Sequence, residues 1–311
     1  MSFETGKEAE GTEIDKIHSQ ITTYSTLNPL PIISDFFAGK VVIVTGSSNG
    51  IGREAARQYA ARGARVTITG RNPDTLKVTK QMCLDAGAKP TDVVEVLGDI
   101  SAEETVHKII NASVEAFGQI DVLVNNAGMV FVDASGGKGF EQPLEIFDKT
   151  LAVNTRSVIA LTQLSTPYLE KTKGAVVNIS SISGQPFYSP GGAFYNIAKA
   201  ALDQLTVQMA GHLIKKGVRV NSISPGAVRT DFGTKMGIPS EAIDRLLNVY
   251  SEDRMMIPLG RVGTPDDIAK LILFLSDRTQ SEFIVGQRII ADGGSMLHNN
   301  CLSTDFFDKL Q

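Results

Sequence analysis

Short runs of aliphatic and β-branched residues alternate with longer segments of helical periodicity from Lys40 onward. Such runs are typical of parallel strands that are buried on both faces of a sheet. They predict strands at 41–44, 66–69, 93–97, 122–124, 175–180, 219–224 and 288–291. The periodic segments between them predict helices at 52–62, 75–86, 103–117, 147–168, 195–215 and 267–276. Three of these helices should end at the glycines Gly63, Gly87 and Gly118.

Regular alternation of strands and helices is typical of a parallel sheet that is covered by helices on both faces. The pattern predicts an α/β chain with a single doubly wound Rossmann-type domain of about seven parallel strands over residues 40–294. Residues 230–258 break the rhythm and are predicted to form a small substrate cap. Residues 1–39 are read as an N-terminal extension and residues 295–311 as a C-terminal tail. This extension is either a loose tail or a partly ordered segment. In the second case Ile32, Ile33, Phe36 and Phe37 form a docking patch.

The composition narrows the function classes. Hydrophobic residues make up 42% of the 311 positions, which is enough to bury a sizeable core. A formal net charge of −4 argues against a nucleic-acid binder, and no apolar run approaches the roughly 20 residues of a membrane span. The two cysteines rule out a disulfide framework, and the scattered histidines show no metal-ligand spacing. We therefore expect a cytoplasmic protein without a metal, a membrane anchor or a nucleic-acid partner.

The first predicted strand runs directly into the glycine-rich segment Thr45-Gly46-Ser47-Ser48-Asn49-Gly50-Ile51-Gly52. Glycines at a strand-to-helix turn allow a tight bend and a close approach of the backbone to a pyrophosphate. The free N–H groups and the positive dipole end of the following helix attract the same anion. The segment therefore predicts a dinucleotide site.

This segment resembles the Thr-Gly-x-x-x-Gly-x-Gly motif of the short-chain dehydrogenase/reductase family, and the resemblance covers residues 40–294. Asn125-Asn126-Ala127-Gly128, after the fourth strand, is similar to a further motif of that family, and Asp99-Ile100 matches its adenine-binding position. The resemblance implies an oxidoreductase that assembles as a homodimer or homotetramer. It also implies cofactor contacts at Gly46, Ser48, Asn49, Gly50, Ile51, Gly52, Asp99, Ile100, Asn126, Ala127 and Gly128.

The end of the second predicted strand bears on the choice between NADP and NAD. An NAD enzyme places a ribose-binding carboxylate there, whereas this chain has Gly70 followed by Arg71 and Asn72. A guanidinium can bind the 2′-phosphate of NADP through two hydrogen bonds. We therefore predict NADP(H) as the cofactor, with Arg71 and Asn72 among its contacts. The alternative is that Arg71 is a solvated surface charge, since the glycine-rich segment lacks the basic residue that many NADP-dependent members carry.

A Tyr-x-x-x-Lys pair, Tyr195 and Lys199, opens the helix that follows the fifth strand. The i, i+4 spacing places both side chains on one helix face, where an ammonium favours the phenolate of a neighbouring tyrosine. Reduction of a carbonyl needs such a proton donor for the developing alkoxide. The family resemblance makes Tyr195 the acid/base, Lys199 its partner, Ser181 the group that holds the substrate oxygen, and Asn154 the support of a water relay to the lysine. Tyr195 and Lys199 also count as cofactor contacts.

The serine assignment leaves alternatives. Ser181 and Tyr195 are 14 positions apart, about one more than is common in the family. We place the extra residue in the loop 185–194. Ser180 and Ser183 remain alternatives for the functional hydroxyl, although the spacing from Ser181 to Gly184 fits the family pattern.

Pro225-Gly226-Ala227-Val228-Arg229-Thr230 resembles the family's Pro-Gly-x-x-x-Thr motif after the sixth strand. It implies cofactor contacts at Pro225, Gly226, Val228 and Thr230. The cap that follows is rich in apolar residues, so we expect an apolar substrate of small to medium size. Its predicted contacts are Ser181, Phe187, Tyr195, Phe232 and Met236.

These observations favour an NADP(H)-dependent oxidoreductase that interconverts a carbonyl and a secondary alcohol. Two other functions stay open for a chain with this pattern. One is a cofactor-binding regulatory or scaffold protein of the same fold without turnover, since a fold does not fix a function. The other is an isomerase or dehydratase, which nothing in the sequence requires.

Overall fold

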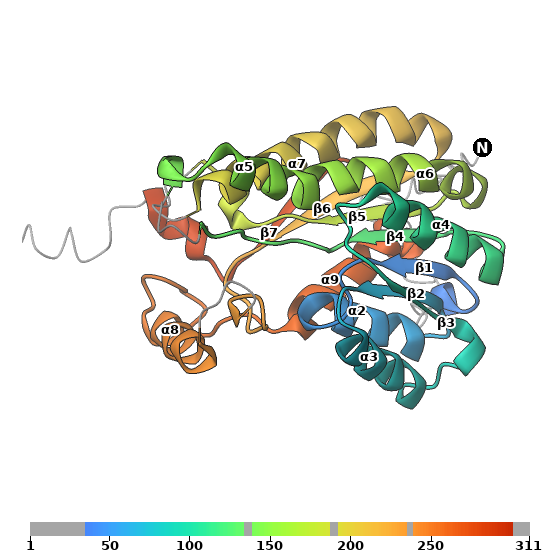
Figure 1. Ribbon diagram of the computed structural model, residues 1–311, viewed down its shortest axis with the longest axis horizontal. Coiled ribbons are helices and arrows are strands. Elements are labelled where there is room, and N and C mark those ends of the chain that lie inside the picture. Colours follow the sequence, from blue (N-terminus) through green and yellow to red (C-terminus); the bar gives the residue numbers. More distant parts are fainter. Residues whose placement is uncertain (1–34, 134–138, 187–191, 235–238, 301–311) are drawn as a thin grey trace, which may run out of the picture. The chain divides into compact units, whose positions relative to one another are not determined.

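Seven strands form one fully parallel sheet in the order β3-β2-β1-β4-β5-β6-β7 (Figure 1). This arrangement confirms the predicted fold class. The chain first builds outward from β1 to β3 and then returns across β1 to continue with β4. The strands are β1 (Val41–Val44), β2 (Arg65–Gly70), β3 (Val93–Leu97), β4 (Val122–Asn125), β5 (Ala175–Ile179), β6 (Arg219–Pro225) and β7 (Arg288–Ala291).

The computed structural model describes residues 35–133, 139–186, 192–234 and 239–300. Most of the predicted N-terminal extension, the end of the predicted tail, and the predicted substrate contacts Phe187 and Met236 lie outside these ranges. None of the described helices combines the length and the hydrophobicity that crossing a bilayer requires.

Alternate residues of the central strands serve two separate cores. Val42 and Val44 of β1 point into one hydrophobic cluster, and Ile43 between them points into the other. Helices α2 (Gly50–Ala61), α3 (Pro73–Asp85) and α9 (Pro265–Ser276) cover the first face. Helices α4 (Glu103–Phe117), α6 (Ser157–Thr172) and α7 (Ala193–Leu213) cover the second face, and α5 (Leu144–Leu151) packs against α7 (Figure 1). Burial on both faces explains why these strands are continuous apolar runs.

Several helices begin two residues earlier than the apolar periodicity predicts. The first residues of α3 and α9 are Pro73 and Pro265, which follow the capping residues Asn72 and Thr264. Proline suits the first position of a helix because its missing N–H would have no helical partner there. Periodicity detects the buried face of a helix, but these first residues belong to the cap and the first turn.

The segment predicted as one helix over 147–168 is instead two helices with a π-helical turn between them. α5 ends at Leu151, the π-turn occupies Ala152–Arg156, and α6 continues from Ser157. A π-turn inserts an extra residue into the helical repeat and often occurs at functional sites. Here it carries the predicted site residue Asn154.

The predicted cap contains one helix, α8 (Ser240–Glu252), and a small hydrophobic cluster of its own. The cluster is centred on Leu247, Ile257 and Val262. Val228 and Gly263, which flank the predicted cap, form an isolated parallel bridge. The cap is therefore anchored directly to the segment that follows β6.

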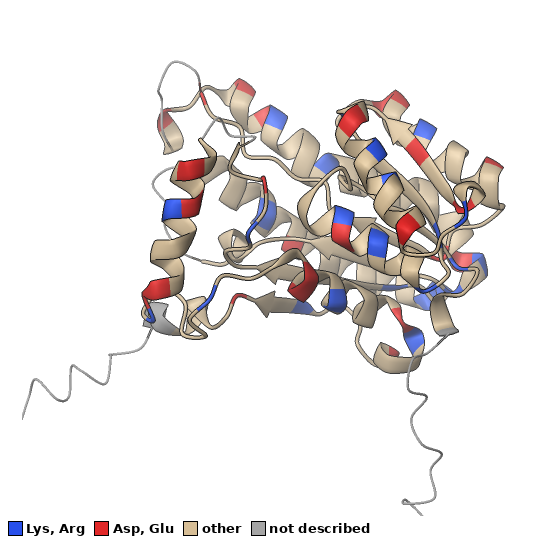
Figure 2. Ribbon diagram, turned by 90° about the horizontal axis from the view of Figure 1, so that it is seen from below, with Lys and Arg blue, Asp and Glu red and all other residues tan. Residues whose placement is uncertain are grey.

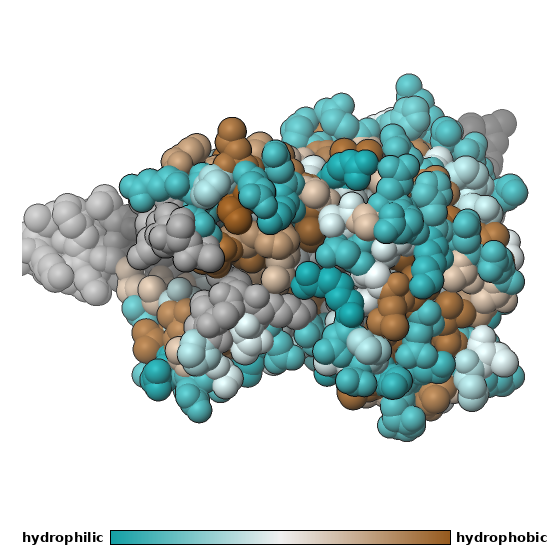
Figure 3. Space-filling model, viewed as in Figure 1, coloured by the Kyte–Doolittle hydropathy of each residue, from teal (hydrophilic) through white to brown (hydrophobic). Residues whose placement is uncertain are grey.

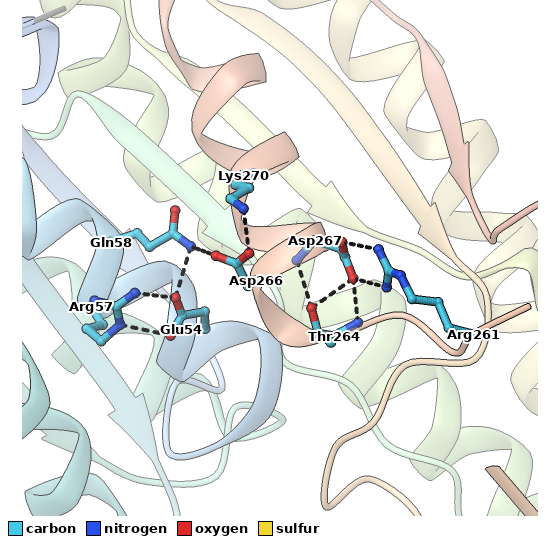
Figure 4. Close-up of polar contacts among 8 residues, drawn as sticks. All are labelled: Glu54, Arg57, Gln58, Arg261, Thr264, Asp266, Asp267 and Lys270. Carbon is cyan, nitrogen blue, oxygen red and sulfur yellow. Dashed lines mark hydrogen bonds and ion pairs between the residues drawn. The ribbon is translucent and has the colours of Figure 1, made fainter. Parts of the chain in front are cut away.

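Polar contacts join α2 to α9 on the first face of the sheet (Figure 4). Gln58 of α2 donates to both Glu54 and Asp266, and Asp266 also pairs with Lys270. At the start of α9, Thr264 and Asp267 form a reciprocal capping box, and Arg261 binds both oxygens of Asp267. These bonds hold the pKa of the Asp267 carboxyl well below its usual range. They fix the chain where it leaves the cap and re-enters the body of the domain.

Candidate active site

The loop after β1 packs tightly against the loop after β4. Gly46 has a φ of +62°, and a Cβ atom there would lie 2.8 Å from Cα of Ala127. The Thr45 hydroxyl accepts hydrogen bonds from the N–H groups of Asn126 and Ala127, both at 3.0 Å. In return, the Asn126 side-chain amide donates to the carbonyls of Thr45 and Gly46 at 2.9 and 3.1 Å. The two segments singled out in the sequence therefore form one rigid floor.

A cavity of about 640 Å³ lies over this floor, along the carboxyl ends of the strands. Its volume falls in the range of about 300–1,000 Å³ that is usual for cofactor and small-molecule sites. The structure brings nearly all described members of the predicted site to this cavity. The predicted residues that line it are Gly46, Ser48, Asn49, Gly50, Ile51, Arg71, Asp99, Ile100, Asn126, Ala127, Gly128, Ser181, Tyr195, Lys199, Pro225, Gly226, Val228, Thr230 and Phe232.

The glycine-rich loop leaves room for a pyrophosphate because its glycines carry no side chain. At Gly50, where φ is +55°, a Cβ atom would lie 3.1 Å from the Thr230 side chain across the cavity. Helix α2 begins at Gly50, directly after this loop, and its N-terminus therefore lies at the cavity. A helix N-terminus beside such a cradle fits an anionic dinucleotide, because its dipole and N–H groups favour negative charge. The donor set therefore suits the predicted cofactor.

Three predicted residues do not line the cavity. Gly52 lies behind the loop, where a Cβ atom would be 2.4 Å from the side-chain nitrogen of Asn126. The Asn72 side chain accepts hydrogen bonds from the N–H groups of Asp74 and Thr75, so it caps α3. Asn154 is fully buried and binds backbone groups instead.

Arg71 lies at the cavity with 54% of its side chain exposed, 3.7 Å from the carboxylate of Asp99. A carboxylate at the preceding position, as in an NAD site, would be obstructed in this chain. A Cβ atom at Gly70 would lie 2.8 Å from that of Ser48. Arg71 therefore places a cation at the end of β2, next to a position where any side chain would have to displace Ser48.

Tyr195, Ser181 and Lys199 come together at the other end of the cavity. The side chains of Ser181 and Tyr195 are hydrogen-bonded, and Lys199 Nζ lies 5.5 Å from the centre of the tyrosine ring. Burial raises the pKa of Tyr195 to about 12, although the bond to Ser181 opposes this shift. Burial also lowers the pKa of Lys199 to about 8, and the charge of Asp203 opposes that shift. Burial therefore outweighs the lowering of the tyrosine pKa that the sequence predicts, and Lys199 Nζ donates to the carbonyl of Ile179 at 2.9 Å.

The structure separates the roles of the three candidate serines. Ser181 is the N-cap of the short 3-10 helix Ile182–Gly184, and its oxygen accepts the N–H of Ser183 at 3.1 Å. The buried hydroxyl of Ser180 donates to the carbonyl of Lys199 at 3.3 Å, so it is directed at the backbone of α7. Ser183 lines the cavity, but Ser181 is the serine that is bonded to Tyr195.

Asn154 connects the π-turn to the loop after β4. Its side-chain nitrogen donates to the carbonyls of Met129 and Thr150, at 2.8 and 2.9 Å. Its oxygen accepts the N–H of Met129 at 3.1 Å. The amide therefore fixes the backbone that forms one wall of the cavity next to Lys199. A Cβ atom at Gly128 would lie 3.1 Å from this oxygen and 3.4 Å from Lys199 Nζ, which shows how closely the groups approach.

The end of the cavity beyond Tyr195 is mostly apolar. The Phe232 ring lies 6.1 Å from that of Tyr195, between their centres. Further apolar residues line the cavity, namely Met129, Val130, Val153, Ile243, Leu246 and Leu247. Exposed apolar residues also occur in α5 and α8, at Leu144 and Val249, and hydrophobic surface is visible over both elements (Figure 3).

Charge does not concentrate on one face of the described chain. Lys and Arg alternate with Asp and Glu along the helices, without a continuous basic stripe among the described residues (Figure 2). Along the cavity, the charged lining residues are Arg71, Asp99 and Lys199.

Sequence reasoning missed several residues at the site. Thr69, Gly98, Gly192, Asn196 and Gly233 also line the cavity. Asp203, one helical turn after Lys199, is 2% exposed and influences the lysine charge. The i, i+4 spacing from Lys199 was the available signal, because an acidic residue on the buried face of a helix is unusual.

Comparisons with known proteins agree with this geometry. A family model described as enoyl-(acyl carrier protein) reductase matches residues 46–296. An uncharacterised oxidoreductase of Bacillus subtilis is 35% identical over 83% of this chain and 92% of its own length. A short-chain dehydrogenase/reductase from Caenorhabditis elegans, solved with cofactor, is 45% identical with a TM-score of 0.84, covering 87% of this chain and 99% of that one. A glucose dehydrogenase from the same organism, solved in the apo form, is 44% identical with a TM-score of 0.72 and corresponding coverages of 84% and 99%.

The contact between Gly46 and Ala127 predicts a specific effect of a single methyl group. Gly46→Ala should weaken NADPH binding at least about tenfold, because the added carbon collides with the backbone of Ala127. This effect comes in addition to the roughly 1–2 kcal/mol that a left-handed conformation costs an alanine. Titration of NADPH fluorescence measures this affinity.

Gly39→Ala is the matched control for this substitution. Gly39 has a φ of +72°, but a Cβ atom there meets nothing within 4 Å. Gly39→Ala therefore has the same conformational cost of a left-handed alanine, but the added carbon meets no neighbouring atom. This variant should leave NADPH affinity unchanged. Equal affinities of the two variants would show that the close approach at Gly46 is unimportant.

Proposed function

The chain belongs to the short-chain dehydrogenase/reductase family, and we propose that it is an NADP(H)-dependent oxidoreductase that interconverts a carbonyl and a secondary alcohol. The family assignment makes it an oxidoreductase with a nicotinamide cofactor. The observation that carries the proposal is the hydrogen-bonded pair of Ser181 and Tyr195 beside Lys199, in the same cavity as the glycine-rich loop.

Bound NADPH would supply the hydride, and the chain would supply a proton and hold the substrate oxygen. The phenol of Tyr195 donates its proton to the oxygen that becomes an alkoxide. A pKa of about 12 keeps this phenol protonated at neutral pH, which suits the reductive direction. The Ser181 hydroxyl, bonded to the same phenol, holds the substrate oxygen within reach of it.

Lys199 and Asn154 support this proton transfer. The ammonium of Lys199 over the tyrosine ring favours the phenolate that is left after the proton leaves. Asn154 fixes the loop at Met129 and holds the adjoining wall of the cavity in place. We also assign to Asn154 the support of a water relay that returns a proton to Lys199.

The lining supports an apolar substrate of small to medium size. Phe232 lies beside Tyr195, Leu246 and Leu247 also line the cavity, and its charged lining residues are limited to Arg71, Asp99 and Lys199 among the described residues. Ordering an ionic substrate against these apolar side chains would leave its charge without a partner, which is costly in an apolar pocket. We place the substrate between Phe232 and the Ser181–Tyr195 pair.

The preference for NADP(H) is supported by Arg71 and by the lack of room for an acidic side chain at Gly70. We further propose that the protein forms a homodimer or homotetramer. The terminal strand β7 supports this, because its outer edge has no paired strand among the described residues and Ile290 on it is 43% exposed. A cytoplasmic location stays a prediction.

Replacement of the proposed proton donor tests the reaction. Tyr195→Phe should lower kcat for NADPH-dependent reduction of apolar ketones and aldehydes by about 100-fold or more, since general acid catalysis contributes about 10²–10⁴-fold. NADPH consumption at 340 nm measures this rate, and NADPH affinity shows that the variant is folded. A wild-type protein that binds NADPH but turns over none of a broad panel would favour a binding function instead.

Replacement of the proposed phosphate-binding cation tests cofactor preference. Arg71→Asp should reduce the ratio of NADPH to NADH affinity by about 10- to 100-fold, because charge-assisted hydrogen bonds contribute about 1.5–3 kcal/mol. Lys77→Asp makes the same change in net charge on an exposed position of α3 outside the cavity, so the ratio should not change. An unaltered ratio in Arg71→Asp would contradict the assignment.

A further inference from the structure

A buried carboxylate lies one helical turn beyond Lys199. Asp203 of α7 is 2% exposed, yet one of its two oxygens, Oδ1, is buried without a hydrogen-bond partner among the described residues. The other oxygen, Oδ2, accepts a hydrogen bond from the Gln185 side chain at 3.0 Å. A buried acceptor without a partner is destabilising, and more so when it is charged. Packing alone does not account for a carboxylate at this position.

The groups that face Asp203 come from several elements. Lys199 lies on its own helix, Arg288 on β7 contributes a positive charge, and Gln185 donates a hydrogen bond. Burial raises the pKa of Asp203, and Lys199, Arg288 and Gln185 oppose that shift without cancelling it. They therefore favour an ionised carboxylate inside the domain.

Asp203 also adjoins the segment that carries Ser181. A Cβ atom at Gly184 would lie 2.9 Å from both Asp203 Oδ2 and the backbone carbon of Lys199. The short 3-10 helix after Ser181 therefore rests directly on the stretch of α7 between Lys199 and Asp203. The bond from Gln185 to Asp203 closes the far end of this segment.

Lys199 has few other sources of negative charge. Its Nζ donates to the neutral carbonyl of Ile179, and among the described residues no carboxylate lies within ion-pairing distance of it. Asp203 is the charge that opposes the loss of the lysine proton on burial. Asp203 does not line the cavity, so it acts on the reaction only through its neighbours.

We propose that Asp203 is a positioning residue whose buried negative charge acts on the ammonium of Lys199 from one helical turn away on α7. This inference rests on the proposed function, in which the ammonium of Lys199 both favours the Tyr195 phenolate and binds the cofactor. The hydrogen bond to Gln185 is a separate, structural contribution. The effect on Lys199 requires the negative charge of Asp203, whereas the hydrogen bond from Gln185 does not. The two contributions can therefore be measured separately.

Removal of the charge should move the pH dependence in one direction. Without Asp203, Lys199 holds its proton less tightly and loses it at a lower pH than the present value of about 8. The pKa of Tyr195 is shifted by burial and by Ser181, and Asp203 does not contribute to it. A change in the pH profile of an Asp203 variant is therefore assigned to Lys199. The alkaline limb of the pH profile should therefore move to lower pH by about one unit, the size expected for a charge one helical turn away.

The test compares Asp203→Asn with Gln185→Leu in the full chain. The first removes the charge at nearly constant shape, and the second removes the hydrogen bond but keeps the charge. We expect Asp203→Asn to lower kcat/KM about five- to tenfold at pH 8 and much less at pH 6. Gln185→Leu should lower it equally at both pH values. An unshifted pH profile in Asp203→Asn, with losses like those of Gln185→Leu, would overturn the proposal.

NADPH affinity gives a readout that does not need turnover. If Lys199 binds the cofactor as an ammonium, the pH at which affinity declines should also fall by about one unit in Asp203→Asn. This shift can be observed even if the panel of carbonyl substrates fails, so failure of the proposed reaction and failure of this inference are distinguishable. An identical pH midpoint in both proteins would count against the charge role.

A double variant provides the same test if Asp203→Asn does not fold. Asp203→Leu combined with Gln185→Leu removes both partners of the hydrogen bond and leaves no polar group unsatisfied, which is close to neutral for stability. It should show the same displaced midpoint of NADPH affinity relative to Gln185→Leu alone. A midpoint equal to that of Gln185→Leu would overturn the proposal.

Discussion

The close approach of two backbones at the carboxyl ends of β1 and β4 is the constraint on which the site depends. The strand order reverses between these strands, so the loops that follow them diverge and leave a crevice. Gly46 contacts Ala127, and Thr45 and Asn126 exchange hydrogen bonds across the same junction. This junction sets the height of the glycine-rich loop above the sheet. It thereby places the N-terminus of α2 and the wall at Gly128 on one cavity.

The second half of the site depends on burial rather than on backbone approach. Lys199 and Asp203 point from one face of α7 into the space beneath the Ser181 segment, and both are almost completely buried. Burial shifts the pKa of Tyr195 upward and that of Lys199 downward, so both groups tend toward their neutral forms. Opposing charges and hydrogen bonds then decide which form persists. The proposed chemistry therefore depends on a few groups whose surroundings keep them close to a change of charge.

The sequence pattern was sufficient to predict the sheet and most of the residues that line the cavity. Strands buried on both faces are continuous apolar runs, and the segments at their carboxyl ends meet at one edge, so Gly46, Asn126, Ser181 and Val228 could be placed together in advance. The π-turn at Asn154 could not be predicted, because it changes the hydrogen bonding of a helix without interrupting its periodicity. Asn72 was assigned to the cofactor, but a capping residue and a ligand-binding residue look alike in a sequence. The i, i+4 spacing places Asp203 on the same helix face as Lys199, but its burial depends on long-range packing that the sequence does not show.

Transfer of deuterium from NADPH labelled at the reactive nicotinamide carbon is the most direct test of the central claim that this cavity carries out hydride transfer. The wild-type protein should place the label on the carbinol carbon of an apolar alcohol product, and Tyr195→Phe should do so far more slowly while still binding NADPH. Mass spectrometry of the product reads the result. Product without deuterium, or equal rates of labelling by the wild-type and Tyr195→Phe proteins, would contradict the account.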